Sequence, residues 1–496
     1  MTKRNGRPMP LAALALAGLG ALGSVGATAQ APPLLPGLDP LAAKDPFPST
    51  YAPLPSVTTA IINATVLTGT GADEIADATV LMQGGRIAAV GPDVAVPPGA
   101  TVVDAAGKWV TPGIIDAHSH LGVYASPAID PHSDGNEAIS PNTPGVWSEH
   151  SIWPQDPGFA RALAGGVTSL MILPGSANLF GGRTVVVRNL PGRTMQSMKF
   201  PGAPYGLKMA CGENPKRVYG GQGREPSTRM GNVKGYREAW IGAQEYRAEW
   251  DKYREDLARF EDDLAAWKAK DPADRDKEPA PPQAPGRDLG KETLAGVLAG
   301  EILVQNHCYR ADEMAIMTDI AEEFGFRITM FHHASEAYKV ADLLAEKDIC
   351  IATWAEWWGF KLESYDGIQE NAALSHEKGV CTIIHSDDET LIQRLNQEAG
   401  IAMAAGRRLG LDIDRGEAIT WITSNPAKAI GVGDRTGSLE PGKMADVVIW
   451  SGDPFSVYSV AERVYMDGAI AFDRADPAYQ PQTDFELGQV GKEARR

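Results

Sequence analysis

The stretch that decides the fold runs from Thr111 to His120 and reads TPGIIDAHSH. A Thr-Pro-Gly turn precedes the apolar pair Ile114-Ile115, as is typical at the start of a buried strand. The stretch ends in His118 and His120, and because side chains alternate along a strand, both imidazoles point to the same side. Two neutral imidazoles side by side form half of a site for zinc or another transition metal. Taken alone, the pair could also be two hydrogen-bonded histidines of a core.

Strand-like apolar runs alternate with helical patterns through the middle of the chain. Helical patterns cover residues 310–323 and 337–346, for example. Such alternation implies parallel strands, and at this length it predicts an α/β fold with a (β/α)8 TIM-like barrel over residues 113–435. The candidate strands are 113–117, 169–173, 206–210, 301–305, 327–331, 349–353 and 380–384.

Both ends of the chain are rich in short strand patterns separated by glycine turns. Near the start these are 59–62, 78–82 and 86–90, and near the end 445–450 and 464–468. Short strands with glycine turns are typical of a small β-sandwich. We therefore expect one β-sandwich built from residues 55–112 and 436–475, with an extended lead-in at 30–54 and a C-terminal tail at 476–496.

The first 29 residues have the composition of a targeting segment. Lys3, Arg4 and Arg7 precede an apolar run over 11–25, and Ala27-Thr28-Ala29 supplies small residues for cleavage. This pattern predicts a secretory signal peptide over 1–29, with an uncleaved anchor as the alternative. The expected mature protein is exported, periplasmic or secreted, and does not insert into a membrane.

Composition narrows the classes of partner. The chain has 496 residues with 46 Lys and Arg against 63 Asp and Glu, giving a net charge of -17. An acidic surface repels phosphate backbones, so nucleic acid is not an expected partner. The four cysteines are widely spaced and form no zinc-ribbon pattern, so we interpret them as small buried side chains. A chain of this length does not need disulfides for stability.

One segment departs from the barrel pattern. From Tyr236 to Lys270 the chain is strongly charged, with apolar residues from Ala243 to Trp267 at spacings of three and four. That stripe predicts a long helix, and the proline-rich residues 271–288 follow it. We interpret 236–288 as an inserted helical arm. The helix could pack on its own barrel, or the stripe could join a second copy of the chain into a homo-oligomer.

Further polar residues follow later strands of the predicted barrel. His307 closes the run 301–306, His332 and His333 close 328–331, and Asp387 follows 382–386. Active sites of such barrels form at the carboxyl ends of the strands. The order His-x-His, His, His, Asp therefore predicts a metal site there.

With these residues the sequence resembles the metal-dependent amidohydrolase superfamily, within its imidazolonepropionase-like group. The segment Pro441–Asp446, PGKMAD, is similar to the return strand of that family's β-sandwich. The resemblance implies one or two divalent ions, Zn²⁺ first and Mn²⁺ or Fe²⁺ as alternatives. It assigns His118 and His120 as ligands from the first strand, His307 from the fifth and His333 from the sixth. Asp387 is then the ligand from the eighth strand and the catalytic residue that handles the proton of the attacking water.

Three positions need a choice between neighbours. The family's histidine stands before a small residue, Ser or Thr and Glu, which favours His333 over His332; the latter is then expected outside the ligand set or facing a helix. The Ser-Asp pattern favours Asp387 over Asp388. On the fourth strand, relatives use either a carboxylated lysine or a glutamate as a bridge, so Lys208 and Glu213 are both candidate metal ligands.

Three other residues are candidates for substrate binding. Arg310 could hold a carboxylate, with a salt bridge at a helix start as the alternative. His385 shares the side of Asp387, and Tyr219 follows Glu213. The expected reaction is hydrolysis of a C–N bond in an amide, cyclic amide or peptide-like compound. A deaminase or a lactone or phosphoester hydrolase at the same site, and a secreted binding protein without catalysis, are the alternatives.

Overall fold

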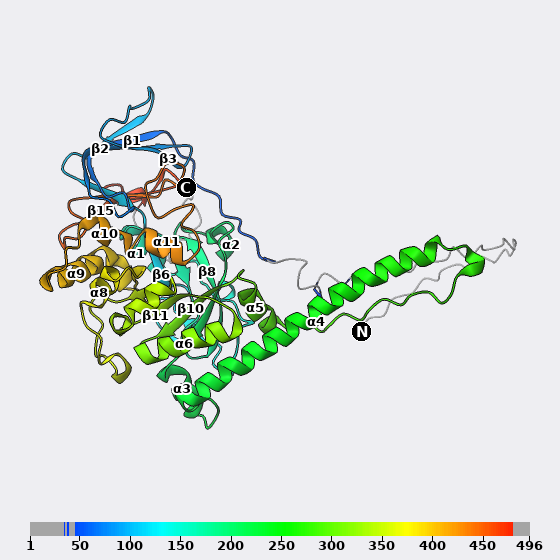
Figure 1. The fold of residues 1–496 in the computed structure, drawn as a ribbon. Helices are drawn as coiled ribbons and strands as arrows, with labels where there is room; N and C mark the ends of the chain where they lie inside the picture. Colours follow the sequence, from blue (N-terminus) through cyan, green and yellow to red (C-terminus); the bar gives the residue numbers. More distant parts are fainter. Residues whose placement is uncertain (1–33, 35–36, 39–44, 480–496) are drawn as a thin grey trace, which may run out of the picture.

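The structure is a computed structural model that describes residues 34, 37–38 and 45–479 (Figure 1). The predicted signal peptide, most of the lead-in before residue 45 and residues 480–496 of the tail lie outside this range. An eight-stranded barrel sheet forms the centre, and its strands follow one another in chain order. They are β6 (Ile114–Ser119), β7 (Val167–Ile172), β8 (Phe180–Arg188), β9 (Gly206–Ala210), β10 (Leu303–Cys308), β11 (Ile328–His333), β12 (Cys350–Thr353) and β13 (Thr382–Ile384).

The α/β fold with a TIM-like barrel is thus confirmed, with one departure at its third strand. β8 runs antiparallel to both β7 and β9, so β7 and β8 form a hairpin where a helix was expected. Two glycines at the start of β8 allow a close approach of the backbone. A Cβ at Gly182 would lie 2.4 Å from the carbonyl oxygen of Val146. Arg183 N donates to that same oxygen at 2.8 Å, which fixes the loop before β8 against the barrel.

Helices surround the barrel, and α6 shows why the sequence places them there. It buries Met314, Met317 and Phe324 against the barrel, begins with acidic residues that suit the helix dipole, and ends at Gly325 with φ +71°. The helices are α1 (Pro157–Ala164), α2 (Met195–Met198), α3 (Glu213–Gly220), α4 (Arg229–Ala269), α5 (Leu289–Leu298), α6 (Ala311–Phe324), α7 (Ala341–Glu346), α8 (Asn371–Glu377), α9 (Leu395–Arg408), α10 (Arg415–Thr420) and α11 (Ser424–Ala429).

Strands from both ends of the chain share a second sheet. β14 pairs antiparallel with β5, which joins the late strands to the early ones. The sheet branches at β1, because β4 and β5 both pair with it at different residues. Its order is β16-β15-β14-β5-β1-β2-β3 with β4 beside β1. The strands are β1 (Thr59–Val66), β2 (Ile75–Gln83), β3 (Arg86–Gly91), β4 (Thr101–Asp104), β5 (Trp109–Pro112), β14 (Val447–Trp450), β15 (Ala461–Met466) and β16 (Ala469–Asp473).

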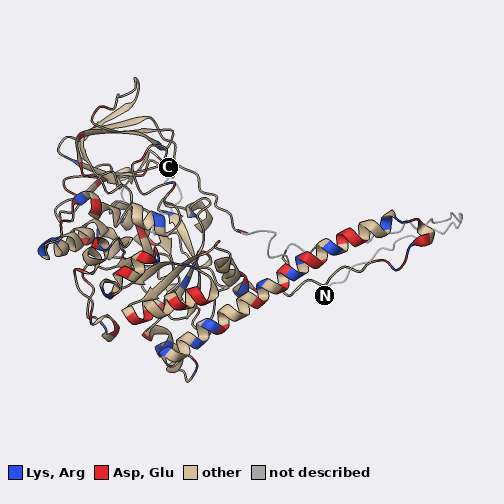
Figure 2. Ribbon diagram, viewed as in Figure 1, with Lys and Arg blue, Asp and Glu red and all other residues tan. Residues whose placement is uncertain are grey.

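The long helix expected in 236–270 is α4, which begins earlier, at Arg229. Its first half packs on the barrel, where Trp240 stacks on Phe326 with ring centroids 4.3 Å apart. Its second half projects from the body, and residues 270–288 run back along it (Figure 1). Near the tip, Trp267 Nε1 donates to the carbonyl oxygen of Asp276 at 2.8 Å. Acidic and basic residues alternate along the projecting part (Figure 2).

The interpretation of the cysteines as unpaired small side chains is wrong, because the four form two disulfides. Cys211 bonds Cys308, and Cys350 bonds Cys381. Each pair lies on or next to adjacent strands, β9 with β10 and β12 with β13. Spacing along the sequence does not reveal such a pairing, since it depends on which strands are neighbours in the sheet.

None of the described helices combines the length and apolar character needed to span a bilayer.

Candidate metal centre

Three side chains from opposite ends of the barrel sequence meet at the carboxyl ends of its strands. His118 and His120 come from β6 and its end, and Asp387 follows β13. Asp387 Oδ1 lies 3.3 Å from His118 Nε2 and 3.1 Å from His120 Nε2, and the two ring nitrogens are 3.3 Å apart. One atom from each thus converges on a volume of the size a metal ion needs.

Of the two candidates for the fourth strand, Lys208 reaches this cluster. It is buried on β9, and its Nζ lies 3.3 Å from His118 Nε2. Burial lowers the pKa of Lys208 to about 8. Glu213 is not in the group whose ligand atoms converge, because the turn at Gly212, with φ +83°, directs the chain into α3. The Glu213 carboxylate faces Lys361 Nζ at 3.5 Å.

Three further histidines supply unpaired nitrogen atoms to the same region. Both ring nitrogens of His307 and of His385, and Nδ1 of His333, are buried without a hydrogen-bond partner. His118, His333 and His385 form a second group with ligand atoms close enough for one ion. Burial lowers the pKa of His385 to about 3 and the pKa values of His118, His307 and His333 well below the usual range. Neutral imidazoles with free lone pairs fit a transition-metal site.

Simple alternation along β11 would place His332 against a helix, which was one of its two expected positions, but the side chain does not lie there. It is buried inside the barrel, with its ring centroid 4.7 Å from that of His118. The ring of His333 lies at a similar 4.8 Å. Alternation fails here because His333 and Ala334 both have positive φ, +71° and +36°, so the chain turns within the strand end. His332 and His333 therefore both contact His118.

The choice of Asp387 over Asp388 agrees with the geometry. Asp387 has φ +58°, and its backbone N–H donates to the carbonyl oxygen of His118 at 2.9 Å, which binds this loop to β6. Asp388 turns away and accepts from the backbone N–H groups of Thr390 and Leu391 at 2.9 and 2.8 Å. It shapes the local turn.

Asp116 fixes the loop that carries Asp387. The Ser386 hydroxyl donates to Asp116 Oδ2 at 2.5 Å, and the Ser386 backbone N–H donates to Oδ1 at 3.2 Å. Burial raises the pKa of Asp116 to about 7. Trp354 adds a third contact by donating its indole N–H to the carbonyl oxygen of Ser386 at 3.0 Å. The contacts of Ser386 with Asp116 and Trp354 thus fix the position of the adjacent Asp387.

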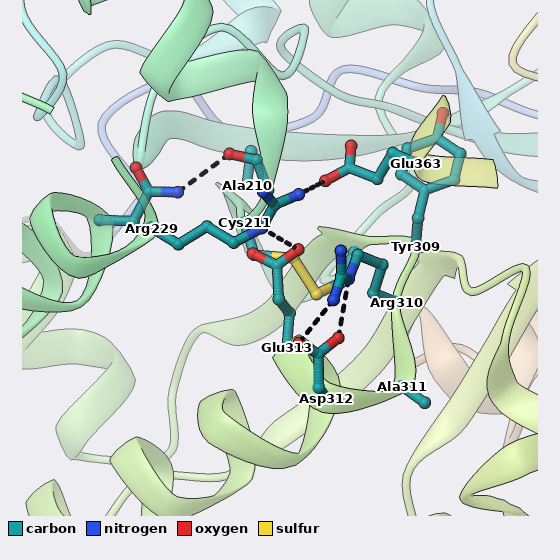
Figure 3. Close-up of a disulfide and its surroundings, with 12 residues drawn as sticks. Ala210, Cys211, Arg229, Tyr309, Arg310, Ala311, Asp312, Glu313 and Glu363 are labelled. Carbon is teal, nitrogen blue, oxygen red and sulfur yellow. Dashed lines mark hydrogen bonds and ion pairs between the residues drawn. A yellow bond between two sulfur atoms is a disulfide. The ribbon is translucent and has the colours of Figure 1, made fainter. Parts of the chain in front are cut away.

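Two of the three predicted substrate-binding residues lie away from the cluster. Arg310 pairs with Asp312 through two hydrogen bonds of 2.9 and 3.0 Å at the start of α6, which is the alternative interpretation (Figure 3). Tyr219 is buried on α3, and its hydroxyl donates to the carbonyl oxygen of Ser140 at 2.7 Å. Burial raises its pKa to about 12. His385 alone among the three lies at the cluster.

An aromatic wall beside the histidines was missed by the sequence analysis. Trp354 stacks on His333 with centroids 4.4 Å apart, and Tyr309 lies nearly parallel to the same ring at 5.1 Å. Trp357 stacks on Trp354 at 5.1 Å and is 37% exposed. A signal existed for Tyr309, because it stands two residues after His307 and so points to the same side.

The Cys211–Cys308 disulfide lies beside the site. Cys308 follows His307 directly, and Cys211 N donates to the carbonyl oxygen of His307 at 2.8 Å. Figure 3 shows a charged group next to it, in which Arg229 at the start of α4 binds Glu313 and Glu363, both at 2.9 Å. The disulfide joins the ends of β9 and β10, and the charged group connects the start of α4 to α6 and to the segment after β12.

Comparisons with known proteins agree with this arrangement. A family model described as "Amidohydrolase family" matches residues 319–472. The solved structure of an amidohydrolase from Thermotoga maritima is 37% identical, covers 84% of this chain and all of its own, and superposes with a TM-score of 0.71. The amidohydrolase tasK of Hapsidospora irregularis is 32% identical over 410 residues, which are 79% of this chain and 40% of that protein. An imidazolonepropionase from Thermoplasma volcanium is 31% identical over 111 residues, 21% of this chain and 26% of its own length. The chain thus spans less than half the length of these curated relatives.

Proposed function

Because the chain belongs to the amidohydrolase family, we propose that it is a metal-dependent hydrolase of a C–N bond in an amide, cyclic amide or peptide-like small molecule. The observation that carries the proposal is the convergence of His118 Nε2, His120 Nε2 and Asp387 Oδ1 beside buried, unpartnered ring nitrogens. A divalent cation bound there, Zn²⁺ with Mn²⁺ or Fe²⁺ as alternatives, supplies a Lewis acid that acidifies water and polarises a carbonyl group.

In this proposal His118, His120 and Asp387 would hold one ion, and His307 and His333 would contribute to a second. Lys208, once carboxylated, would supply a further ligand to the same site. A neutral lysine amine attacks CO₂ and loses a proton to give a carbamate, and the lowered pKa of Lys208 increases the neutral fraction. Its burial next to His118 also favours a modified side chain, since an unpaired ammonium in that position is costly. Glu213 is not part of the proposed ligand set.

Asp387 is the proposed general base and acid. Its side chain is 22% exposed, whereas His118 beside it is fully buried, so the carboxylate is accessible to solvent and substrate. It takes the proton of the attacking water and returns it to the leaving nitrogen. The contacts of Asp116 and Ser386 keep it in place during both transfers.

The aromatic wall suggests which substrates fit. Tyr309 and Trp354 line the histidines, and Trp357 and Phe360 continue the wall outward with exposures of 37% and 53%. Aromatic faces favour apolar and planar groups. We therefore propose that the scissile bond carries an apolar substituent, and that His385 contacts the substrate or a metal ion.

The test begins with metal analysis of the purified protein and of metal-free protein reloaded with Zn²⁺, Mn²⁺ or Co²⁺. Turnover is then screened on N-acyl amino acids, dipeptides and cyclic amides, with amino-heterocycles, lactones and phosphoesters as competing classes. We expect at least one tightly bound ion per chain and amide hydrolysis that depends on it. Protein that binds none of these ions would refute the proposal, and preference for a competing class would replace the C–N assignment.

The role of Asp387 is tested on the substrate so identified. Asp387→Asn should lower kcat about 10²–10⁴-fold, as expected when a general base and acid is lost. Asp388→Asn is the matched control, because that neighbouring carboxylate only shapes the local turn. Wild-type turnover in Asp387→Asn would show that the assignment is wrong.

We also propose that the protein is exported. Two disulfides support this, because such bonds persist in oxidising compartments, and the predicted signal peptide at 1–29 agrees with it.

A further inference from the structure

A chain of hydrogen bonds runs through the buried interior of the barrel, from the end of α11 to the candidate metal centre. Gln305 Nε2 donates to the carbonyl oxygen of Ala429, the last residue of α11, at 3.2 Å. Gln305 Oε1 lies 2.9 Å from His332 Nε2. His332 Nδ1 lies 2.8 Å from His118 Nδ1. All three side chains are completely buried.

The Ala429 carbonyl gives this chain a direction. A carbonyl oxygen can only accept, so the Gln305 amide must present its NH₂ group to Ala429 and its oxygen to His332. His332 Nε2 must then carry a proton and donate it, which leaves Nδ1 of the neutral ring as an acceptor. His118 Nδ1 is therefore the donor in the last bond. Its other nitrogen, Nε2, retains the free lone pair.

The reverse direction is disfavoured at each link. A flipped Gln305 would bring two carbonyl oxygens to 3.2 Å in a buried place, where an unmade hydrogen bond costs about 1–3 kcal/mol. A doubly protonated His332 would bury a charge, and no carboxylate of the described residues forms an ion pair with it. Only one placement of the protons on the two neutral imidazoles therefore satisfies all three hydrogen bonds.

We infer that Gln305 and His332 are positioning residues that hold His118 in the tautomer with its proton on Nδ1 and its lone pair on Nε2. This inference rests on the proposed metal-dependent function. Nε2 is the atom that lies 3.3 Å from both His120 Nε2 and Asp387 Oδ1. The chain of hydrogen bonds therefore directs the lone pair of His118 Nε2 toward His120 and Asp387 in the metal-free protein. Losing such an outer hydrogen bond typically weakens metal affinity about 10–100-fold.

The experiment measures Zn²⁺ affinity of metal-free full-length protein by competition with a chelator. His332→Leu removes the acceptor for His118, and Gln305→Met removes the acceptor for His332 at nearly equal size. His332→Asn keeps an oxygen close to the position of Nδ1. We expect at least tenfold weaker Zn²⁺ binding in the first two variants and affinity within about threefold of wild type in the third. His150→Leu, which removes a 45% exposed histidine outside the chain of bonds, should bind like wild type.

Thermal unfolding of each metal-free variant shows whether it is folded. If His332→Leu does not fold, Gln305→Met decides, because it leaves both histidines in place. The inference is overturned if Gln305→Met and His332→Leu bind Zn²⁺ like wild type, or if His332→Asn is as weak as His332→Leu. If wild-type protein binds no Zn²⁺, Mn²⁺ or Co²⁺, the proposed function itself fails, which is a separate result.

Discussion

Arg188 and Asp446 form a buried bidentate ion pair although 258 residues separate them. Both guanidinium Nη atoms donate to the carboxylate at 2.6 Å, and Nη2 also lies 3.0 Å from Asp467 Oδ2. Arg188 ends β8 of the barrel, whereas Asp446 precedes β14 and Asp467 follows β15 of the second sheet. The pair therefore fixes the two sheets against each other, and it gives the last residue of the PGKMAD segment a physical role.

Replacing Asp446 should destabilise the protein strongly. Asp446→Asn leaves Arg188 buried with one of its two carboxylates, and breaking a buried pair costs on the order of 3–5 kcal/mol. Urea unfolding measures the loss in free energy of unfolding. Glu225→Gln is the control, because its pair with Lys234 is exposed and should contribute at most about 1 kcal/mol. Equal effects of the two variants would contradict this account.

The two disulfides should differ in their effect on the metal centre. Replacing either pair by serines should lower the free energy of unfolding by roughly 2–5 kcal/mol. Only Cys211→Ser with Cys308→Ser should also weaken Zn²⁺ binding, because Cys308 follows His307 directly. The Cys350 and Cys381 pair lies at the starts of β12 and β13, away from the ligands. Chelator competition on both double variants makes the comparison, and similar Zn²⁺ affinities would refute it.

Glu398 should make stability fall as the pH rises. Burial raises its pKa from the usual 4.5 to about 7, with Glu356 adding to the effect and Arg394 opposing it. Below pH 4.5 the group is protonated in both states. Between pH 4.5 and 7 the unfolded chain releases the proton and the folded chain keeps it, so stability is lost by up to about 3 kcal/mol.

Glu398→Gln should therefore be more stable than wild type at pH 8 and equal to it at pH 4. Chemical unfolding at both pH values measures the difference. Glu261→Gln, which removes an exposed carboxylate on the arm, is the matched control for the loss of one negative charge. A gain that is the same at pH 4 and pH 8 would exclude titration of Glu398 as the cause.

The projecting part of the arm should be dispensable for the metal centre. The first half of α4 is not, since Tyr236 and Trp240 belong to the barrel core. We expect that replacing residues 254–284 by a short Gly-Ser linker leaves Zn²⁺ affinity unchanged. Sedimentation of the same variant tests the alternative in which the apolar stripe of the arm joins a second copy of the chain, since a homo-oligomer formed in this way should dissociate when the arm is removed. An unchanged oligomeric state would exclude the arm as its interface, and lost Zn²⁺ binding would show that the arm supports the site.

The buried parallel strands were predictable because such strands appear as continuous apolar runs. β9 was predicted with its observed bounds, and the expected strands at 113–117 and 327–331 each begin one residue before β6 and β11 and end before them. β8 was not predicted, because Phe180-Gly181-Gly182-Arg183 has the composition of a turn. The glycines are there for close packing against Val146, which only the three-dimensional arrangement reveals.

The candidate site was largely predictable where ligands end a strand. His118, His120 and Asp387 meet as expected, since the carboxyl ends of barrel strands share one face. Of the two places expected for His332, the one facing a helix is wrong, because positive φ at His333 interrupts the alternation on which it depended. The other, a place outside the ligand set, is consistent with the 2.8 Å contact between His332 Nδ1 and His118 Nδ1. Arg310 was predicted to bind substrate only because it stands three residues after His307 in the sequence. It forms a salt bridge with the neighbouring Asp312 instead.

The pairing of β5 with β14 has a consequence for biosynthesis. Pro112 pairs with Val447, so the edge of β5 has no β14 partner until the chain has been synthesised from residue 112 to residue 447. At about 5–20 residues per second this interval lasts tens of seconds. An unpaired strand edge is a template for association with other chains. The edge of β5 is therefore open to association with other chains until β14 is available, and a premature stop codon before residue 447 would leave that edge open permanently.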